Sequence, residues 1–386
     1  MIELDRNTAV PEICPDYDPW DPINSLMRYG RHTLTSVEVT VSHLCNMRCE
    51  HCAVGDSLVT KEGDMLPLDR LLHRLEEISH LETISITGGE PAFRRDTVRN
   101  VIIPLLRYAR QRGLRSQLNS NITMDLERYE EIAPYLDVLH ISHNYTGAEE
   151  FREIGFARAE NPTGNGSAAR LYEQMMNNAR ALARGGLFVS AESMINYRTH
   201  EKLPDIHRLI VEMGCKRHEV HPMYPSAFAR HLPVLGLDEL RQAIHRLLDA
   251  RDPSVWMLFG TLPFFACTNS EEDRRLLERL KAAPQVTVRN DPDGRNRLNV
   301  SLFDGNVHVT DFADFPPLGN IKQDRLEDVF GTWLDHSLSR TVSCHCPTAS
   351  CCGPNLLVKD TYYRNEDFTR RKAPGEVSGS KLVLPV

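Results

Sequence analysis

The sequence lacks long hydrophobic runs, internal repeats and low-complexity segments. Nowhere do about 18 apolar residues follow one another, the length needed by a membrane-spanning helix. The first residues, MIELDRNTAVPEIC, also lack the basic and then apolar pattern of an export signal. We therefore expect a cytoplasmic protein with no membrane partner.

The sequence also has fewer basic than acidic residues. The 386 residues include 45 Lys and Arg against 53 Asp and Glu, which gives a net charge of -8. Binding along nucleic-acid phosphates needs a basic surface, so this balance argues against bulk nucleic acid as a partner. The length is sufficient for one large domain with an appendage, or for two domains.

Ten cysteines are present, but without an export signal they are better assigned to reduced thiols or metal ligands than to disulfides. Two groups stand out in the chain, namely Cys45, Cys49 and Cys52, and then Cys344, Cys346, Cys351 and Cys352. The other three, Cys14, Cys215 and Cys267, are scattered, and we interpret Cys14 and Cys215 as structural.

Strand and helix patterns alternate six times from residue 37 onward, which predicts a parallel sheet with helical crossovers. The expected strands cover residues 37–41, 83–87, 115–119, 138–142, 187–193 and 219–221. Helical periodicity is clearest over 67–81 and 167–186. Polar residues follow each strand, so we expect a barrel-like or open α/β sheet with its site at the strands' carboxyl ends.

The pattern changes beyond residue 236. Helices are expected near 237–250, 270–283 and 324–338. Between the last two, the stretch RLNVSLFDGNVHVTDF places Asp304-Gly305-Asn306 between alternating apolar residues, which predicts a hairpin. The polar residues 371–386 are expected to form a loosely ordered tail.

The stretch LCNMRCEHC puts three thiols at the spacing Cys-x3-Cys-x2-Cys just after the first expected strand. Such a loop allows each thiolate to bind a different iron of a cubane. Structural zinc sites and iron-sulfur clusters normally take four ligands, so a missing fourth leaves one iron open. The competing interpretation is a zinc knuckle completed by His43 or His51.

A second motif, Thr87-Gly88-Gly89-Glu90-Pro91, follows the second expected strand. Glycines let the backbone approach a ligand, and a carboxylate with free carbonyls suits an ammonium group. Together the two motifs resemble the radical S-adenosylmethionine (SAM) superfamily, whose signature is Cys-x3-Cys-x-aromatic-Cys followed by GGE(P).

The resemblance implies a partial, TIM-like (β/α)6 barrel and a 4Fe-4S cluster that binds SAM. The residues that it assigns to these cofactors are Cys45, Cys49 and Cys52 as cluster ligands, Gly88, Gly89 and Glu90 at the methionine ammonium, and His51, in place of the usual Tyr or Phe, near the adenine.

Polar groups at other strand ends lie where relatives bind the cofactor or the substrate. On this basis we expect Ser142 and Glu192 to contact the cofactor, although Asn and Ser at strand ends more often cap helices and turns. Of four histidines near these ends, we expect at least one to line the substrate pocket; they are His140, His143, His218 and His221.

The second cysteine group favours metal binding, by zinc or by a second iron-sulfur cluster. Adjacent Cys351 and Cys352 point apart in most backbones, so one of them is expected to serve, with Cys267 as a candidate for the fourth ligand. The order cysteine, hairpin, helix, cysteine group resembles the twitch or SPASM extensions that carry auxiliary 4Fe-4S clusters. Their cysteine after the hairpin is replaced here by Thr310 and Asp311, which favours a single auxiliary cluster.

A narrower resemblance covers residues 14 to 370. The segments CPDYDPW, HCAVG, HISHNY, RHEVHPMYPS, RNDPDGRNRLNV and CGPN, with the Cys-x-Cys-x4-Cys spacing, resemble the YfkAB-type radical SAM proteins. We divide the chain accordingly into an N-terminal extension (1–34), a core barrel (35–235), a small twitch/SPASM-like auxiliary domain (236–370) and a tail (371–386).

These resemblances imply an enzyme that cleaves SAM reductively to a 5'-deoxyadenosyl radical and removes a hydrogen atom from a peptide or small metabolite. A flavodoxin- or ferredoxin-type electron donor is implied as a partner. The auxiliary cluster would transfer electrons or bind substrate. The alternative is an iron-sulfur electron carrier or redox sensor without SAM chemistry.

Overall fold

The structure, a computed structural model, describes residues 12–160, 163–225, 228–310, 315–346 and 349–371. One sheet runs in the order β11-β10-β9-β1-β2-β3-β4-β5-β6-β7-β8. Pairing is parallel from β9 through β1 to β8, and antiparallel only at β10 and β11. The strands are β1 (Ser36–Thr40), β2 (Thr83–Thr87), β3 (Arg115–Ser120), β4 (Val138–Ser142), β5 (Phe188–Ile195), β6 (Arg217–Pro222), β7 (Trp256–Gly260), β8 (Val286–Arg289), β9 (Arg297–Ser301), β10 (Asn306–His308) and β11 (Gly319–Asn320).

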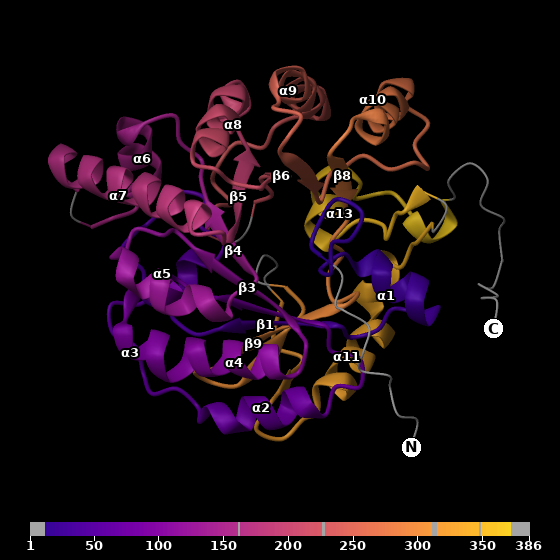
Figure 1. The fold of residues 1–386 in the computed structure, drawn as a ribbon. Coiled ribbons are helices and arrows are strands. Elements are labelled where there is room, and N and C mark those ends of the chain that lie inside the picture. The colour runs from indigo at the N-terminus through magenta and orange to yellow at the C-terminus, as the bar shows by residue number, and fades with distance from the viewer. Residues whose placement is uncertain (1–11, 161–162, 226–227, 311–314, 347–348, 372–386) are drawn as a thin grey trace.

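Helices cover the outer face of this curved sheet (Figure 1). The longer helices bury an apolar stripe; α2, for example, buries Leu71 and Leu75. The helices are α1 (Pro22–Tyr29), α2 (Leu68–Glu76), α3 (Arg95–Thr97), α4 (Ile103–Gln111), α5 (Leu126–Ile132), α6 (Ala148–Gly155), α7 (Asn165–Arg184), α8 (Leu203–Glu212), α9 (Leu237–Ala250), α10 (Glu271–Ala282), α11 (Leu326–Asp335), α12 (Ser337–Thr341) and α13 (Leu356–Tyr362).

All six strands expected from the sequence are present, so the predicted α/β class with a parallel sheet is confirmed. Two further parallel strands, β7 and β8, were not predicted. The first reads WMLFG and every one of its residues is buried, so it has no alternating pattern by which to recognise it.

The C-terminal part of the chain returns to the other edge of the sheet. The predicted hairpin is confirmed: β9 pairs with β10, and Gly305 in the turn has a φ of 81° that favours glycine. Because β9 lies beside β1, the sheet continues across the proposed boundary between residues 235 and 236. That boundary therefore stays a prediction, and residues 372–386 of the expected tail lie outside the described residues.

The N-terminal segment reaches into the interior of the curved sheet. Trp20 is 6% exposed and packs in one cluster with Val138 and Trp256, the first residues of β4 and β7. Its indole N–H donates to the Ser85 hydroxyl at 3.0 Å. Trp20 therefore fills the sheet's interior near the amino ends of β4 and β7, opposite the ends where the site was expected.

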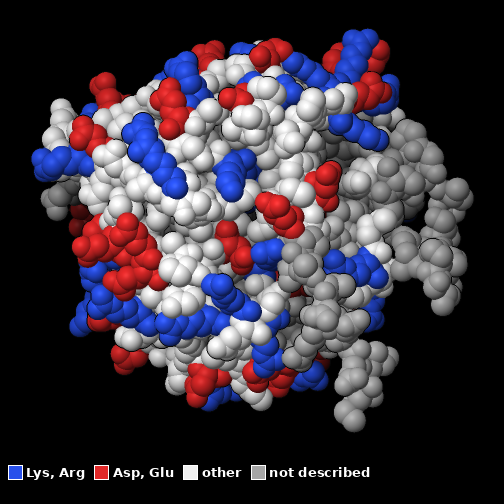
Figure 2. All heavy atoms as spheres, in the orientation of Figure 1, with Lys and Arg blue, Asp and Glu red and all other residues white. Residues whose placement is uncertain are grey.

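The outer surface carries charges of both signs. On the face in Figure 2, Lys and Arg are interspersed with Asp and Glu. Among the described residues no helix combines the length and apolar character needed to cross a membrane.

We expect Trp20→Ala to lower the free energy of unfolding by about 3–5 kcal/mol, the usual cost of truncating a buried aromatic side chain. Denaturant unfolding measures this loss. Met27→Ala, in the adjoining helix α1 and 51% exposed, is the control and should change stability by less than about 0.5 kcal/mol. Equal effects of the two substitutions would contradict the packing role of Trp20.

Candidate functional site

A cavity of about 320 Å³ lies inside the curved sheet at the carboxyl ends of the strands. All three thiols of the first cysteine group line it, as do Gly88 and Gly89. The structure thus brings together the two motifs that the sequence places 35 or more residues apart. All ten cysteines lie within the described residues, and each is a free thiol.

Burial governs the chemistry of the first cysteine group. It raises the pKa of Cys45 to about 12 and that of Cys49 well above the ordinary value, and it also raises the pKa of Cys52. A thiol that resists ionisation in this way is ionised by a bound cation, so metal binding here would release protons.

Several donors point at these sulfurs. The backbone N–H of Met47 donates to Cys45 Sγ at 3.4 Å, and the Asn121 amide lies 3.8 Å from the same sulfur. Burial raises the pKa of Cys52, and the nearby backbone of Val54 opposes this rise. Donors of this kind stabilise thiolates in a metal centre, so the cysteine loop fits an anionic iron-sulfur cluster.

The glycine segment docks directly onto the cysteine loop. The N–H of Gly89 donates to the Ser42 carbonyl and that of Glu90 to the Leu44 carbonyl, both at 2.7 Å. A Cβ at Gly88 would lie 2.3 Å from the Ser42 carbonyl oxygen, and one at Gly89 would lie 2.4 Å from that of Leu44. The close approach of two backbones therefore requires both glycines.

Glu90 lies behind the cavity wall, fully buried, and is not among the lining residues. Its carboxylate accepts hydrogen bonds from the backbone N–H groups of Ala92 and Asn121, at 3.0 and 2.8 Å, and from the Ser120 hydroxyl at 2.8 Å. Its expected contact with the methionine ammonium stays a prediction. In the structure it ties the glycine segment to the end of β3.

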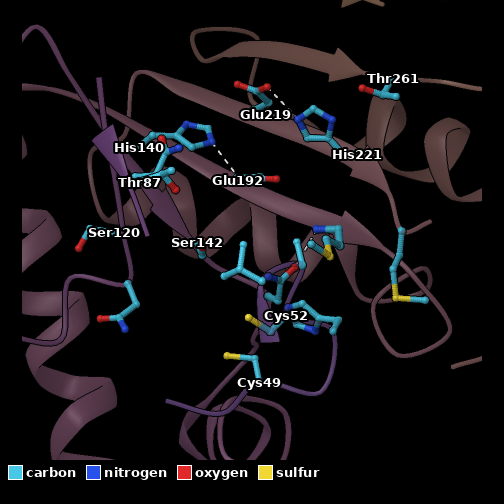
Figure 3. A pocket seen from close by; sticks show the side chains of 18 of the residues that line it. Cys49, Cys52, Thr87, Ser120, His140, Ser142, Glu192, Glu219, His221 and Thr261 are labelled. Carbon is cyan, nitrogen blue, oxygen red and sulfur yellow. Dashed lines mark hydrogen bonds and ion pairs between the residues drawn. The ribbon is translucent and has the colours of Figure 1, made fainter. Parts of the chain in front are cut away.

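The other expected cofactor contacts share the same cavity. Ser142 and Glu192 are register partners on β4 and β5, and both line it together with His51. Glu192 binds His140 Nε2 at 3.1 Å (Figure 3). Although burial opposes ionisation, this hydrogen bond holds the pKa of Glu192 below its usual range.

Two of the four histidines, His140 and His221, line the cavity. The other two, His143 and His218, are fully buried and do not line it. His218 and His221 both lie in β6, but only His221 lines the cavity. Side chains alternate between the two faces of a strand, so positions 218 and 221 lie on opposite faces.

A second pair, of a histidine and a glutamate, lies at the other side of the cavity from the cysteines (Figure 3). His221 Nε2 binds Glu219 Oε1 at 2.8 Å, and Glu219 also pairs with Arg289 and, at 3.4 Å, with Arg217. Burial lowers the pKa of His221, but Glu219 outweighs it and the net shift is upward.

The backbone makes room for this histidine. A Cβ at Gly260 would lie 2.0 Å from the His221 ring. The next residue, Thr261, lines the cavity and has a φ of 53°, which is rare for a β-branched residue and marks strain of the kind found at functional sites. Neither Gly260 nor Thr261 was predicted from the sequence. The only indication there is a glycine at the end of an apolar run.

In the second cysteine group, Cys346 and Cys351 pair through two backbone hydrogen bonds of 2.7 and 3.1 Å. A hydrogen bond with Cys346 and burial raise the pKa of Cys344, with further contributions from Cys351 and Cys267. The structure therefore brings Cys267 to the group despite a separation of more than 70 residues.

The thiol of Cys352 has different surroundings. Burial raises its pKa well above the usual value, and after burial the contributing groups are Asp21, Cys351, Asp291 and Arg295. Asp21 acts on both Cys351 and Cys352, so which of these adjacent thiols serves as a ligand stays a prediction. The four cysteines that share one another's surroundings are Cys267, Cys344, Cys346 and Cys351.

Neither group is arranged for a single ion. Within the described ranges, no three His, Cys, Asp or Glu side chains converge as ligands of one metal ion would. His43, a candidate ligand of the zinc knuckle, packs its ring on Phe303 at 4.4 Å between centroids. A cubane differs, because its ligands bind separate irons.

Comparison with known proteins places the chain in a family. A model of the radical SAM superfamily matches residues 39–210, and a model of the YfkB-like domain matches residues 223–373. The chain belongs to the radical SAM superfamily, which uses a 4Fe-4S cluster and SAM. Within it, the chain is 56% identical over 371 residues to "Putative protein YfkA" of Bacillus subtilis (strain 168), covering 96% of this chain and 100% of that relative.

Solved structures share the fold. Streptococcus suis SuiB bound to S-adenosylmethionine has a TM-score of 0.58 at 14% identity, over 86% of this chain and 75% of that chain. The anSMEcpe structure with bound AdoMet and Cp18Cys peptide has a TM-score of 0.54 at 14% identity, over 78% of this chain and 80% of that chain. At these identities the likeness shows the fold alone, and it confirms the expected radical SAM architecture.

The buried Glu90 carboxyl gives a pH prediction. Burial raises its pKa from 4.5 to about 7, so the folded state binds more protons than the unfolded state between these values. Stability should therefore fall as pH rises through this window, by on the order of 3 kcal/mol for this group. Urea unfolding of the cluster-free protein across the window should show a shallower fall in the Glu90→Gln variant. Equal slopes for the two proteins would rule out a buried, titrating Glu90.

Proposed function

We propose that the protein is a radical SAM oxidoreductase or modifying enzyme that acts on a peptide or a small metabolite. The observation that supports this most directly is the shared cavity, which is lined by all three thiols and by both docked glycines. An electron carrier or redox sensor needs neither a cavity of this size nor the glycine segment, so that alternative is disfavoured.

Cys45, Cys49 and Cys52 would hold the cluster, and Gly88 and Gly89 would hold the methionine end of SAM. When bound, the cluster and SAM supply a 5'-deoxyadenosyl radical that removes a hydrogen atom from the substrate. The protein positions these groups and excludes water: Phe151, Met175 and Met194 form apolar parts of the cavity wall. His51, Ser142 and Glu192 would contact the rest of the cofactor.

A second 4Fe-4S cluster is proposed at Cys267, Cys344, Cys346 and Cys351. Thr261 precedes Cys267 by a few residues and Asn355 follows Cys351, and both line the far part of the cavity. A substrate between the two cysteine groups would thus lie near both. With four protein ligands, the auxiliary cluster would accept an electron from the substrate rather than bind it.

A peptide is the first substrate proposed. SuiB has been solved with its precursor peptide SuiA, and anSMEcpe with a peptide, and both share this fold. A small metabolite is the second choice. A flavodoxin- or ferredoxin-type protein would donate the electron to the first cluster.

The first test is reductive cleavage. After anaerobic reconstitution with iron and sulfide, the protein with SAM and dithionite should produce 5'-deoxyadenosine and methionine. The triple variant Cys45→Ala, Cys49→Ala, Cys52→Ala should lose this activity to background. Cys215→Ala, which removes a buried thiol outside both groups, is the matched control and should retain it. A wild-type protein that holds its cluster but forms no 5'-deoxyadenosine would refute the proposal.

The second test is metal content. We expect about eight irons per chain from two 4Fe-4S clusters, falling by half in the triple variant. Cys267→Ala should alter the electron paramagnetic resonance (EPR) signal that remains in the triple variant, whereas Cys352→Ala should leave it unchanged. Zinc at the second site would contradict the auxiliary cluster, and the reverse result for the two single variants would make Cys352 the ligand.

A further inference from the structure

A carboxylate from a neighbouring loop holds the segment that leads into the cysteine loop. This entry segment, residues 42–44, lies between β1 and Cys45. The carboxylate belongs to Glu62, in the outer loop of residues 53–67 that joins the cysteine loop to α2. Residues 59–61 and 63–64 of the outer loop are exposed, whereas Glu62 is partly buried. The proposed function as stated above assigns no role to Glu62.

One oxygen of Glu62 accepts three hydrogen bonds from the entry segment. The donors to Oε1 are the Ser42 hydroxyl at 2.8 Å and the backbone N–H groups of His43 and Leu44 at 2.5 and 3.1 Å. Consecutive N–H groups that point at one oxygen form a concave site that suits an anion. The three hydrogen bonds together therefore fix the backbone of the entry segment.

The carbonyl groups of the entry segment are also in use. Those of Ser42 and Leu44 accept from the glycine segment, and that of His43 accepts from the Val59 N–H of the outer loop at 3.0 Å. Ser42 is 1% exposed, so water has little access to replace a lost hydrogen bond. Loss of the Glu62 carboxylate would therefore free the N–H side of the entry segment, and the glycine segment docked on its carbonyl side could shift with it.

We propose that Glu62 is a positioning residue for SAM binding. It is not among the residues that line the cavity, so it acts through the entry segment rather than on SAM itself. The entry segment runs directly into Cys45 and carries the docked glycine segment. The cluster and the methionine end of SAM are expected at these two neighbours, so their relative position depends on the conformation that Glu62 holds. The proposal rests on the proposed function, because it requires a cluster and SAM at this site.

The test is SAM binding to the reconstituted protein, measured by equilibrium dialysis on samples matched for iron content. Glu62→Ala removes all three hydrogen bonds, so the dissociation constant for SAM should rise about tenfold or more. The matched control is Asp64→Ala, which removes an exposed carboxylate from the same loop and should leave the dissociation constant unchanged.

A second pair of variants separates the position of the oxygen from its charge. Glu62→Gln keeps the length and an accepting oxygen but removes the charge, so SAM binding should stay within about threefold of wild type. Glu62→Asp keeps the charge but draws the oxygen back by one methylene group, so it should weaken SAM binding as Glu62→Ala does. This pair also serves if Glu62→Ala does not retain its iron.

Wild-type SAM affinity in Glu62→Ala and Glu62→Asp, with full iron content, would overturn this inference and leave the reductive cleavage of SAM intact. Equal losses in Glu62→Gln and Glu62→Asp, or a loss in Asp64→Ala, would also overturn it, because the hydrogen bonds of Glu62 would then not be the cause. A wild-type protein that holds its cluster but binds no SAM would overturn the proposed function and this inference together.

Discussion

The docking of the glycine segment onto the cysteine loop is the contact on which the rest of the site depends. Two backbone hydrogen bonds of 2.7 Å join the segments, and the carbonyls of Ser42 and Leu44 occupy the space where side chains at positions 88 and 89 would lie. Glu90 then ties the joined segments to β3 through Ser120 and Asn121. Three neighbouring strands are thereby fixed around one cavity, so the thiols and the expected SAM-binding backbone share a common frame.

The two ends of the chain complete this frame from opposite sides. Near the amino ends of the strands, Trp20 fills the interior, and at the carboxyl end of β8 Asp18 pairs with Arg289 at 2.7 Å. At the other edge, β9 extends the sheet beside β1, and the second cysteine group follows from the same C-terminal part of the chain. The cavity thus has the first cysteine group on one side and, on the other, Thr261 and Asn355, which lie near members of the second group in the sequence.

Much of this arrangement could be predicted from the sequence because its signals are local. The cysteine spacing, the glycine pair and the hairpin turn each lie within a few residues.

Strands β7 and β8 were missed because a short, fully buried run such as WMLFG has no periodicity that separates it from loop or helix. The alternation of side chains along a strand could have separated the histidines. On β4 and β6 it places His140 and His221 toward the cavity and His218 away from it. The ring of His221 over Gly260, the role of Glu90 behind the wall and the approach of Cys267 to the second group all depend on tertiary contacts between distant segments.

The central claim is that the absent fourth cysteine leaves one iron for SAM. Mössbauer spectroscopy of protein reconstituted with iron-57, in a variant that lacks the second cysteine group, tests it most directly. Addition of SAM should change the spectrum of one iron in four and leave the other three unchanged. A spectrum that is the same before and after SAM, with the cluster intact, would contradict the account.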